Sequence, residues 1–427
     1  KLRPKQGKVT FLWSIGIIIG TATISPAQTA PQPLYDDSAA FAAIQKADPE
    51  EREVAEKLDS TLLWLHHRAS GKQLDIRSVT FKNGDPYDSK FLSEAGRPIV
   101  DVTVIGDLDK AVQSIKSISG VKITGVASTP GYGLISAAIP PMELLKAARP
   151  STIGSIAASQ AQTGKTTSSN SKSEGDANNQ ADEALQVDHV RELFLGTIDG
   201  EGIKIGTLSD SADFLDALKG DGIAGFDESQ GTGDLPPDDR LLLIEDTDDQ
   251  DDEGRAMMEH IYDIAPGVST LGFATAYGGQ ANFANNITAL ADNGMDIIND
   301  DVVYFAEPIY QDGVIAQAVN DYVDSGGIYF SLNHNYGNLS REAVWQDTDK
   351  DNLHDYVTGP VDELMGITLT PNQSITVGLQ WSEPWGKAQT DFEMDIYDAE
   401  GTNYLFSSND NNVGGNPIDL IELTSEG

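Results

Sequence analysis

The middle of the chain alternates between two hydrophobic patterns. Short, nearly unbroken apolar runs are typical of buried strands, and the longer stretches between them repeat apolar residues at helical spacing. The predicted strands span 202–210, 240–246, 268–276, 295–303 and 328–335, and the predicted helices span 253–265, 283–294 and 313–327. This alternation predicts an α/β domain over 189–345, with a parallel sheet covered by helices on both faces.

A different pattern precedes this domain. Within 97–159, strand-like and helix-like runs follow one another in the order β-α-β-β-α-β. The order predicts a small ferredoxin-like α+β domain at the end of a longer region, 31–159. The segment that follows, 160–188, is rich in Ser, Thr, Asn, Gln and Gly over most of its length, so we predict a disordered linker there.

The first thirty residues have the pattern of an export signal. Four basic residues precede the apolar run 11–20, and the small and polar residues SPAQTA follow it. This pattern predicts a signal peptide over 1–30 and a secreted or cell-surface protein. A membrane anchor is the alternative, but the run is shorter than the roughly 20 residues that a span needs, and no later segment is long and apolar enough.

The last part of the chain, 346–427, begins with an acidic loop and continues with strand-like alternation. Apolar residues occupy every second position at Ile375, Val377, Leu379 and Trp381, and alternation resumes from Phe392 to Ile396. We expect a small β-sandwich.

Composition narrows the function classes. The chain has 28 Lys and Arg against 67 Asp and Glu, for a net charge of -39, and it has no Cys. Such a charge repels phosphate backbones, which excludes nucleic acid as a partner. The absence of Cys excludes disulfides, thiolate metal sites and a cysteine nucleophile, and in an exported protein it points to a bacterial source.

Candidate chemistry gathers where the predicted strands of the α/β domain end. Ligands of parallel sheets bind beyond the carboxyl ends of the strands. The polar residues at those ends are Ser209, Asp210, Asn299–Asp301 and Asn333–Asn335, and Glu253 begins a predicted helix beside them.

Four segments around these strand ends resemble subtilisin-like serine peptidases, the subtilase and sedolisin superfamily. They are GEGIKIGTLSDS, DDEGRAMMEHIYDIAPGVSTLGFATA, MDIIND and IYFSLNHNYG, in the family's order over about 140 residues. The resemblance implies a partial subtilisin-like core that hydrolyses peptide bonds in proteins. It also implies that the 97–159 domain is similar to the propeptide that inhibits such enzymes intramolecularly.

The resemblance implies three site residues in this chain. Glu253 stands where subtilases carry their histidine, and sedolisins use Glu as the base. Met257 replaces the Asp that sedolisins carry one turn later, so Asp210 would orient the base. Asn335 matches the residue that stabilises the oxyanion. Ordinary helix-start and cap roles remain alternatives for Glu253 and Asp210.

The family's Gly-Thr-Ser segment does not occur between Asn335 and Gly427. We therefore expect the serine nucleophile beyond the C-terminus of this chain. Two other hypotheses remain open: a catalytically inactive subtilase-like module, and a calcium-dependent surface or adhesion protein.

The acidic loop DTDKDNLHD has the spacing of a calcium site. Asp347, Asp349, Asp351 and Asp355 occupy positions 1, 3, 5 and 9 of an EF-hand-like loop, and their hard oxygen ligands suit structural calcium. Position 6 is Asn352 instead of Gly, and position 12 is Thr358 instead of Glu. A solvated acidic turn is the alternative.

Overall fold

The computed structural model describes fifteen stretches of the chain, to which all statements below refer: 2–4, 14–21, 49–70, 92–93, 97–163, 184–194, 198–214, 225–247, 251–333, 340–348, 350–356, 364–367, 374–398, 401–408 and 411–424. The chain divides into two compact units. Unit 1 comprises Lys1–Gln160, Phe305–Gly313 and Tyr336–Gly427, and unit 2 comprises Ala161–Tyr304 and Val314–Asn335.

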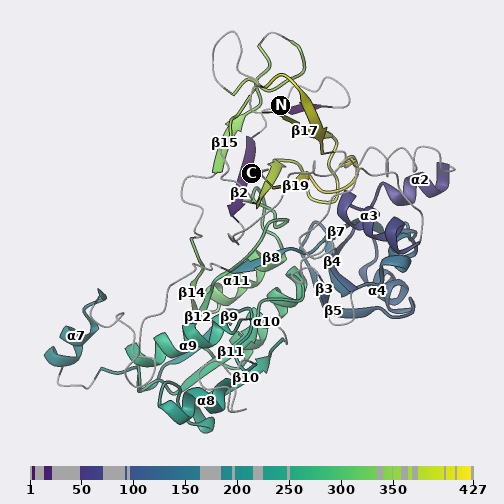
Figure 1. Ribbon diagram of the computed structural model, residues 1–427. Coiled ribbons are helices and arrows are strands. Elements are labelled where there is room, and N and C mark those ends of the chain that lie inside the picture. Colours follow the sequence, from purple (N-terminus) through teal and green to yellow (C-terminus); the bar gives the residue numbers. More distant parts are fainter. Residues whose placement is uncertain are drawn as a thin grey trace, which may run out of the picture. The chain divides into compact units, whose positions relative to one another are not determined.

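Unit 2 is built on a five-stranded parallel sheet (Figure 1). Its strands, in sheet order, are β10 (Leu241–Glu245), β11 (Thr270–Thr275), β9 (Lys204–Ser209), β12 (Ile297–Asp300) and β14 (Ile328–Phe330). Every neighbouring pair is parallel. The predicted α/β core with a parallel sheet is confirmed.

Helices lie on both faces of this sheet. They are α9 (Glu253–Ile264), α10 (Gln280–Asp292) and α11 (Val314–Asp324), and α8 (Gly225–Thr232) packs against α9. The helix α7 (Val187–Leu193) and the short η3 (Asp238–Arg240) are outside this set. Gly206 and Gly272 leave room on one face for Leu290 of α10. On the other face, Phe273 packs with Met258 of α9 in a common core.

The predicted strand over 295–303 is interrupted in the structure. β12 ends at Asp300, and Val302–Tyr304 forms a separate strand, β13, which pairs antiparallel with β8 (Ala161–Thr163). The N–H of Asp301 still donates to the carbonyl of Leu208, at 3.3 Å, before the chain leaves the parallel sheet. The prediction of one continuous strand was wrong, and the break places Asp301 at the end of the sheet.

The first part of unit 1 is a small antiparallel sheet with helices. Its elements are α2 (Pro49–Ala55), α3 (Ser60–Ala69), β3 (Leu92–Ser93), β4 (Arg97–Val104), α4 (Leu108–Lys116), β5 (Lys122–Ser128), β6 (Gly133–Ala138), η2 (Pro141–Glu143), α5 (Leu144–Ala148) and β7 (Ile153–Ala158). From β4 to β7 the element order agrees with the predicted β-α-β-β-α-β unit, and the strands pair in the order β5-β6-β4-β7. Fully buried Val102, Ile115 and Ile156 belong to its core.

The second part of unit 1 contains two antiparallel sheets. One has the order β15 (Ser340–Val344), β2 (Ser14–Thr21), β16 (Ser374–Trp381) and β19 (Ile418–Thr424); the other has the order β1 (Leu2–Pro4), β17 (Phe392–Tyr397) and β18 (Tyr404–Ser407). Val377, Trp381, Phe392 and Met394 share one core.

The strand β2 lies within the segment predicted to be a signal peptide, between β15 and β16. Cleavage of that segment stays a prediction. Within the described stretches, no helix combines the length and the apolarity needed to cross a bilayer.

Candidate active site

Carboxylates from three elements meet at the carboxyl end of the parallel sheet. Asp210 directly follows β9, Asp300 ends β12 with Asp301 next to it, and Glu253 is the first residue of α9. Strands that run parallel bring their carboxyl ends to one edge, which explains why residues so far apart in sequence converge.

Asp210 holds the start of α9 in place. Its side chain is fully buried, and Oδ1 accepts hydrogen bonds from the backbone N–H groups of Glu253 (2.9 Å) and Gly254 (3.4 Å). Oδ2 accepts the N–H of Asp251 at 3.1 Å. These are N–H groups at the beginning of a helix, where the partial positive charge stabilises a carboxylate.

The loop that carries Asp210 is itself fixed from the neighbouring strand. The Thr275 hydroxyl, at the end of β11, donates to the backbone carbonyl of Asp210 at 2.6 Å. The backbone of Glu253 is therefore anchored to two adjacent strands through Asp210. These hydrogen bonds fix the main chain at the start of α9, and the predicted role of Asp210 in orienting the Glu253 side chain stays a prediction.

Asp301 is buried among the other carboxyl groups of this site. Burial raises the pKa of the Asp301 carboxyl to about 8. The negative charges of Glu253, Asp210 and Asp300 contribute to this rise in pKa, and the Ser209 hydroxyl offsets part of it. Asp301 is therefore protonated at neutral pH, and its pKa responds to the charges of the neighbouring carboxylates.

Asp300 is perturbed in the same direction but less. Burial raises its pKa to about 6, and hydrogen bonds from Tyr329, Ser331 and nearby backbone N–H groups oppose the rise. The Ser331 hydroxyl, just beyond β14, donates to Asp300 Oδ1 at 3.1 Å. The group as a whole can hold a proton and also present an ionised carboxylate, which is the requirement for acid–base chemistry.

The structure brings together two of the three predicted site residues. Asp210 and Glu253 lie side by side, whereas Asn335 lies outside the described residues. Asp301 was among the polar residues at predicted strand ends but was not chosen for the site. Its position was visible in the sequence; its raised pKa was not, because burial depends on the tertiary fold.

The acidic loop of unit 1 caps its own backbone. Asp347 accepts the N–H groups of Asp351 (3.1 Å) and Asn352 (3.2 Å), and Asp355 accepts the N–H of Thr348 at 2.7 Å. Asp349 lies outside the described residues. Among the residues that are described, no three metal-ligating side chains are gathered closely enough to hold an ion. Carboxylate oxygens are the type of ligand that calcium prefers. The calcium site stays a prediction.

Comparison with known proteins adds little to this picture. No protein-family profile matches the chain, and no curated protein matches it. Among solved structures, the chain is similar to fervidolysin from Fervidobacterium pennivorans, a keratinolytic enzyme related to subtilisin, with 13% identity and a TM-score of 0.31. The match covers 57% of this chain and 41% of fervidolysin. A likeness this weak carries no argument about fold or function.

Proposed function

We propose that this chain is part of the precursor of a secreted serine peptidase that uses Glu253 as its general base. The observation that carries the proposal is the placement of Glu253 at the carboxyl end of the sheet, with its backbone anchored by Asp210 and its charge felt by Asp301. A base must be held rigidly and must stand near groups that control its proton. The arrangement of these three carboxyl groups supports both requirements.

In the proposed reaction, ionised Glu253 takes the proton of a serine hydroxyl as the serine oxygen attacks the scissile carbonyl carbon. Glu253 then gives the proton to the leaving amine, and a water molecule repeats the sequence to release the acyl group. Asn335 would donate a hydrogen bond to the oxyanion. Protonated Asp301 would limit the build-up of negative charge around Glu253 as substrate binds.

An uncovered part of the sheet supports a place for the nucleophile. Side chains alternate along β14, so Tyr329 faces Tyr322 of α11, while Ile328 and Phe330 share the face that α9 covers elsewhere. These two side chains are 52% and 60% exposed. We propose that a helix carrying the serine nucleophile packs there. A helix antiparallel to the strands begins at their carboxyl ends, so its first residues would lie near Glu253.

The remaining parts of the chain fit this proposal as accessory regions. We propose that 1–30 directs export and that the 97–159 domain acts as an intramolecular inhibitor until it is removed. Structural calcium in the Asp347–Asp355 loop would stabilise the secreted form. The substrates would be proteins or peptides.

Peptide hydrolysis by the full-length protein tests the proposal. We expect activity to fall as the pH drops through the pKa of Glu253 and to persist well below about pH 6, where a histidine base would be protonated, because free Glu titrates near 4.3. Glu253→Gln keeps the shape of the side chain and removes its basicity, so kcat should fall by about 10²–10⁴-fold. Glu201→Gln, an exposed residue before β9, is the matched control and should leave kcat unchanged.

Two outcomes would contradict the proposal. If the Glu253→Gln variant hydrolyses peptides at the wild-type rate, Glu253 is only a helix-start residue. If the folded full-length protein neither hydrolyses peptides nor reacts with a fluorophosphonate serine probe, an inactive module or a surface protein is the better description.

A further inference from the structure

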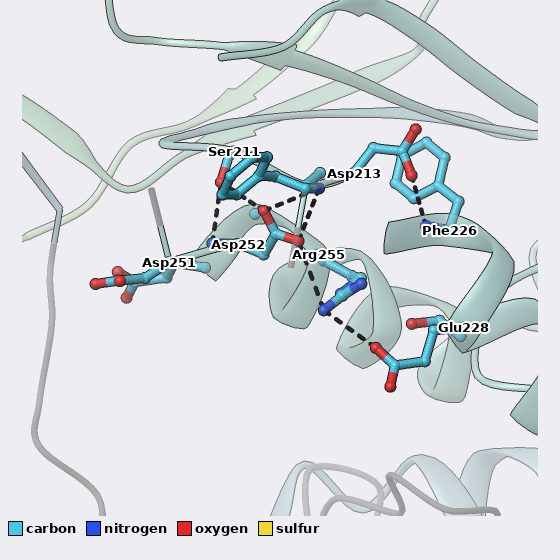
Figure 2. A network of polar contacts seen from close by, with 12 residues as sticks. Ser211, Asp213, Phe226, Glu228, Asp251, Asp252 and Arg255 are labelled. Carbon is cyan, nitrogen blue, oxygen red and sulfur yellow. Dashed lines mark hydrogen bonds and ion pairs between the residues drawn. The ribbon is translucent and has the colours of Figure 1, made fainter. Parts of the chain in front are cut away.

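A buried ion-pair cluster joins α8 to the start of α9 and includes Asp252, the residue before Glu253 (Figure 2). The guanidinium of Arg255 lies 3.5 Å from Asp252 Oδ2 and 3.6 Å from Glu228 Oε2. All three side chains are almost completely buried, at 6%, 2% and 7% exposed. Burial of a charge carries a desolvation penalty that pairing offsets only in part. This cluster therefore costs folding free energy that a surface ion pair would not.

The backbone of Asp252 explains what the cluster holds. Asp252 immediately precedes Glu253 and adopts a left-handed conformation, with φ 51° and ψ 39°. A side chain other than Gly rarely adopts this region unless the surroundings enforce it. This conformation therefore has to be held by contacts from neighbouring segments, at the residue from which α9 starts.

Contacts from the loop after β9 enforce that conformation. The Ser211 hydroxyl donates to Asp252 Oδ1 at 2.6 Å, and its oxygen accepts the N–H of Asp252 at 3.0 Å. The N–H of Phe214 donates to Asp252 Oδ2 at 3.0 Å. The carboxylate of Asp252 thus joins the loop after β9 to the start of α9, and we call this set of contacts the junction. Among the described residues, Arg255 forms the ion pair with Asp252.

We propose that Arg255 is a positioning residue for Glu253. By neutralising Asp252 it keeps the junction closed, and the closed junction fixes the first turn of α9, including the backbone of Glu253 that Asp210 binds. Its role in catalysis rests on the proposed function, whereas its role in fixing the junction does not.

Loss of Arg255 has a direct electrostatic consequence. Asp252 and Glu228 would then face each other as buried carboxylates without their shared cation, and Glu259, which also interacts with Arg255, lies near the same cluster. Repulsion would open the junction and shift Glu253 away from Asp301. Two measurements separate this displacement from a simple loss of charge.

The first measurement is the titration of Asp301, followed by NMR of carboxyl-¹³C-labelled Asp and assigned with Asp301→Asn. If Arg255→Met moves Glu253 away, the pKa of Asp301 should fall, because a neighbouring negative charge is lost. If Glu253 stays in place, removal of a positive charge can only leave the pKa unchanged or raise it. An unchanged or raised pKa in a folded Arg255→Met variant therefore overturns the proposal.

Further variants protect the test against misfolding. Arg255→Lys keeps the charge but loses the fork geometry, so it should retain an Asp301 titration close to wild type. Arg240→Met is the matched control. Arg240, on η3, donates a hydrogen bond of 3.0 Å to the hydroxyl of Tyr262 on α9, the helix that also carries Arg255. No described contact joins Arg240 to Asp252. If Arg240→Met shifts Asp301 as much as Arg255→Met does, general loosening of α9 explains the effect and the proposal fails.

The second measurement is peptide hydrolysis by the full-length protein. Misplacement of a base by about 1 Å can cost about 100-fold in rate, so Arg255→Met should lower kcat by that order and leave KM unchanged. Arg255→Lys should recover most of the loss. If the wild type itself has no activity, the proposed function fails, and the Asp301 titration still decides whether Arg255 positions Glu253.

Discussion

At the scale of single residues, Asp301 combines burial with a position among other acids. Its carboxyl has an ordinary pKa of 3.8, which the fold raises to about 8. Between pH 3.8 and about pH 8, the folded protein therefore keeps a proton on Asp301 that the unfolded chain has already released. Stability from this group is fully present below about pH 4 and is lost as the pH rises through 8.

Asp301→Asn should remove this pH dependence. In wild type the free energy of unfolding should fall with rising pH between 5 and 8, with a contribution from Asp301 of about 1.4 kcal/mol per pH unit. Asn stays neutral, so the variant should lack that contribution. Urea unfolding at several pH values measures the slope, and Asp324→Asn, exposed on α11, is the control. Equal slopes in wild type and Asp301→Asn would contradict the raised pKa.

The same residue marks the limit of sequence reasoning at this scale. That Asp210 and Glu253 meet follows from their places at a strand end and a helix start, which the hydrophobic pattern reveals. That Asp301 is protonated depends on how much water the packed strands exclude and on the charges of Asp300 beside it and of Glu253 and Asp210 from two other segments. Neither quantity is encoded in local spacing.

At the scale of elements, Gly254 determines how closely α9 approaches the sheet. A Cβ at this position would lie 2.3 Å from the Phe273 ring and 2.7 Å from the Ser211 carbonyl oxygen. The N–H of Gly254 donates to that same oxygen at 3.1 Å. Only glycine allows the helix to begin in contact with both neighbouring segments.

Gly254→Ala should therefore destabilise the protein, although Ala favours helices. We expect a loss of about 1–3 kcal/mol from overpacking, measured by urea unfolding. Gly231→Ala on α8 is the matched control, because its Cβ meets nothing within 4 Å; there the substitution should stabilise by up to about 1 kcal/mol. A Gly254→Ala variant as stable as wild type would show that α9 has room to move.

Elements with strong periodicity were predicted and weak ones were not. The helix now seen as α9 repeats apolar residues over three turns, and its prediction is confirmed within one residue. The helix α8, with the sequence GFDESQGT, contains two glycines and one large apolar residue, so its sequence has no hydrophobic periodicity that would predict a helix. Its helix is stabilised by tertiary contacts, including the pairing of Glu228 with Arg255.

At the scale of the whole molecule, the net charge of -39 makes cations a general source of stability. Screening by any salt reduces the repulsion among surface carboxylates. A specific calcium site acts differently, because it responds to micromolar or millimolar calcium at constant ionic strength.

Calcium should raise the melting temperature if the loop of unit 1 binds it. At a calcium concentration 100 times the Kd, the gain in unfolding free energy should be about 2.7 kcal/mol, and Asp349→Ala should abolish it. The control is NaCl at matched ionic strength. A rise that NaCl reproduces, or that Asp349→Ala retains, would show that the loop holds no calcium.

Because unit 1 is assembled from separated stretches of chain, its parts become available at different times during translation. A nascent chain leaves the ribosome from its N-terminus at roughly 5–20 residues per second. The small antiparallel sheet is complete once β7 has emerged, and the parallel sheet once β14 has emerged. β2 precedes both of these sheets in the chain, yet its neighbours β15 and β16 come from 340–344 and 374–381. This apolar segment is therefore made more than 300 residues before its neighbours β15 and β16, and during that interval ribosome-associated chaperones or the export machinery have access to it.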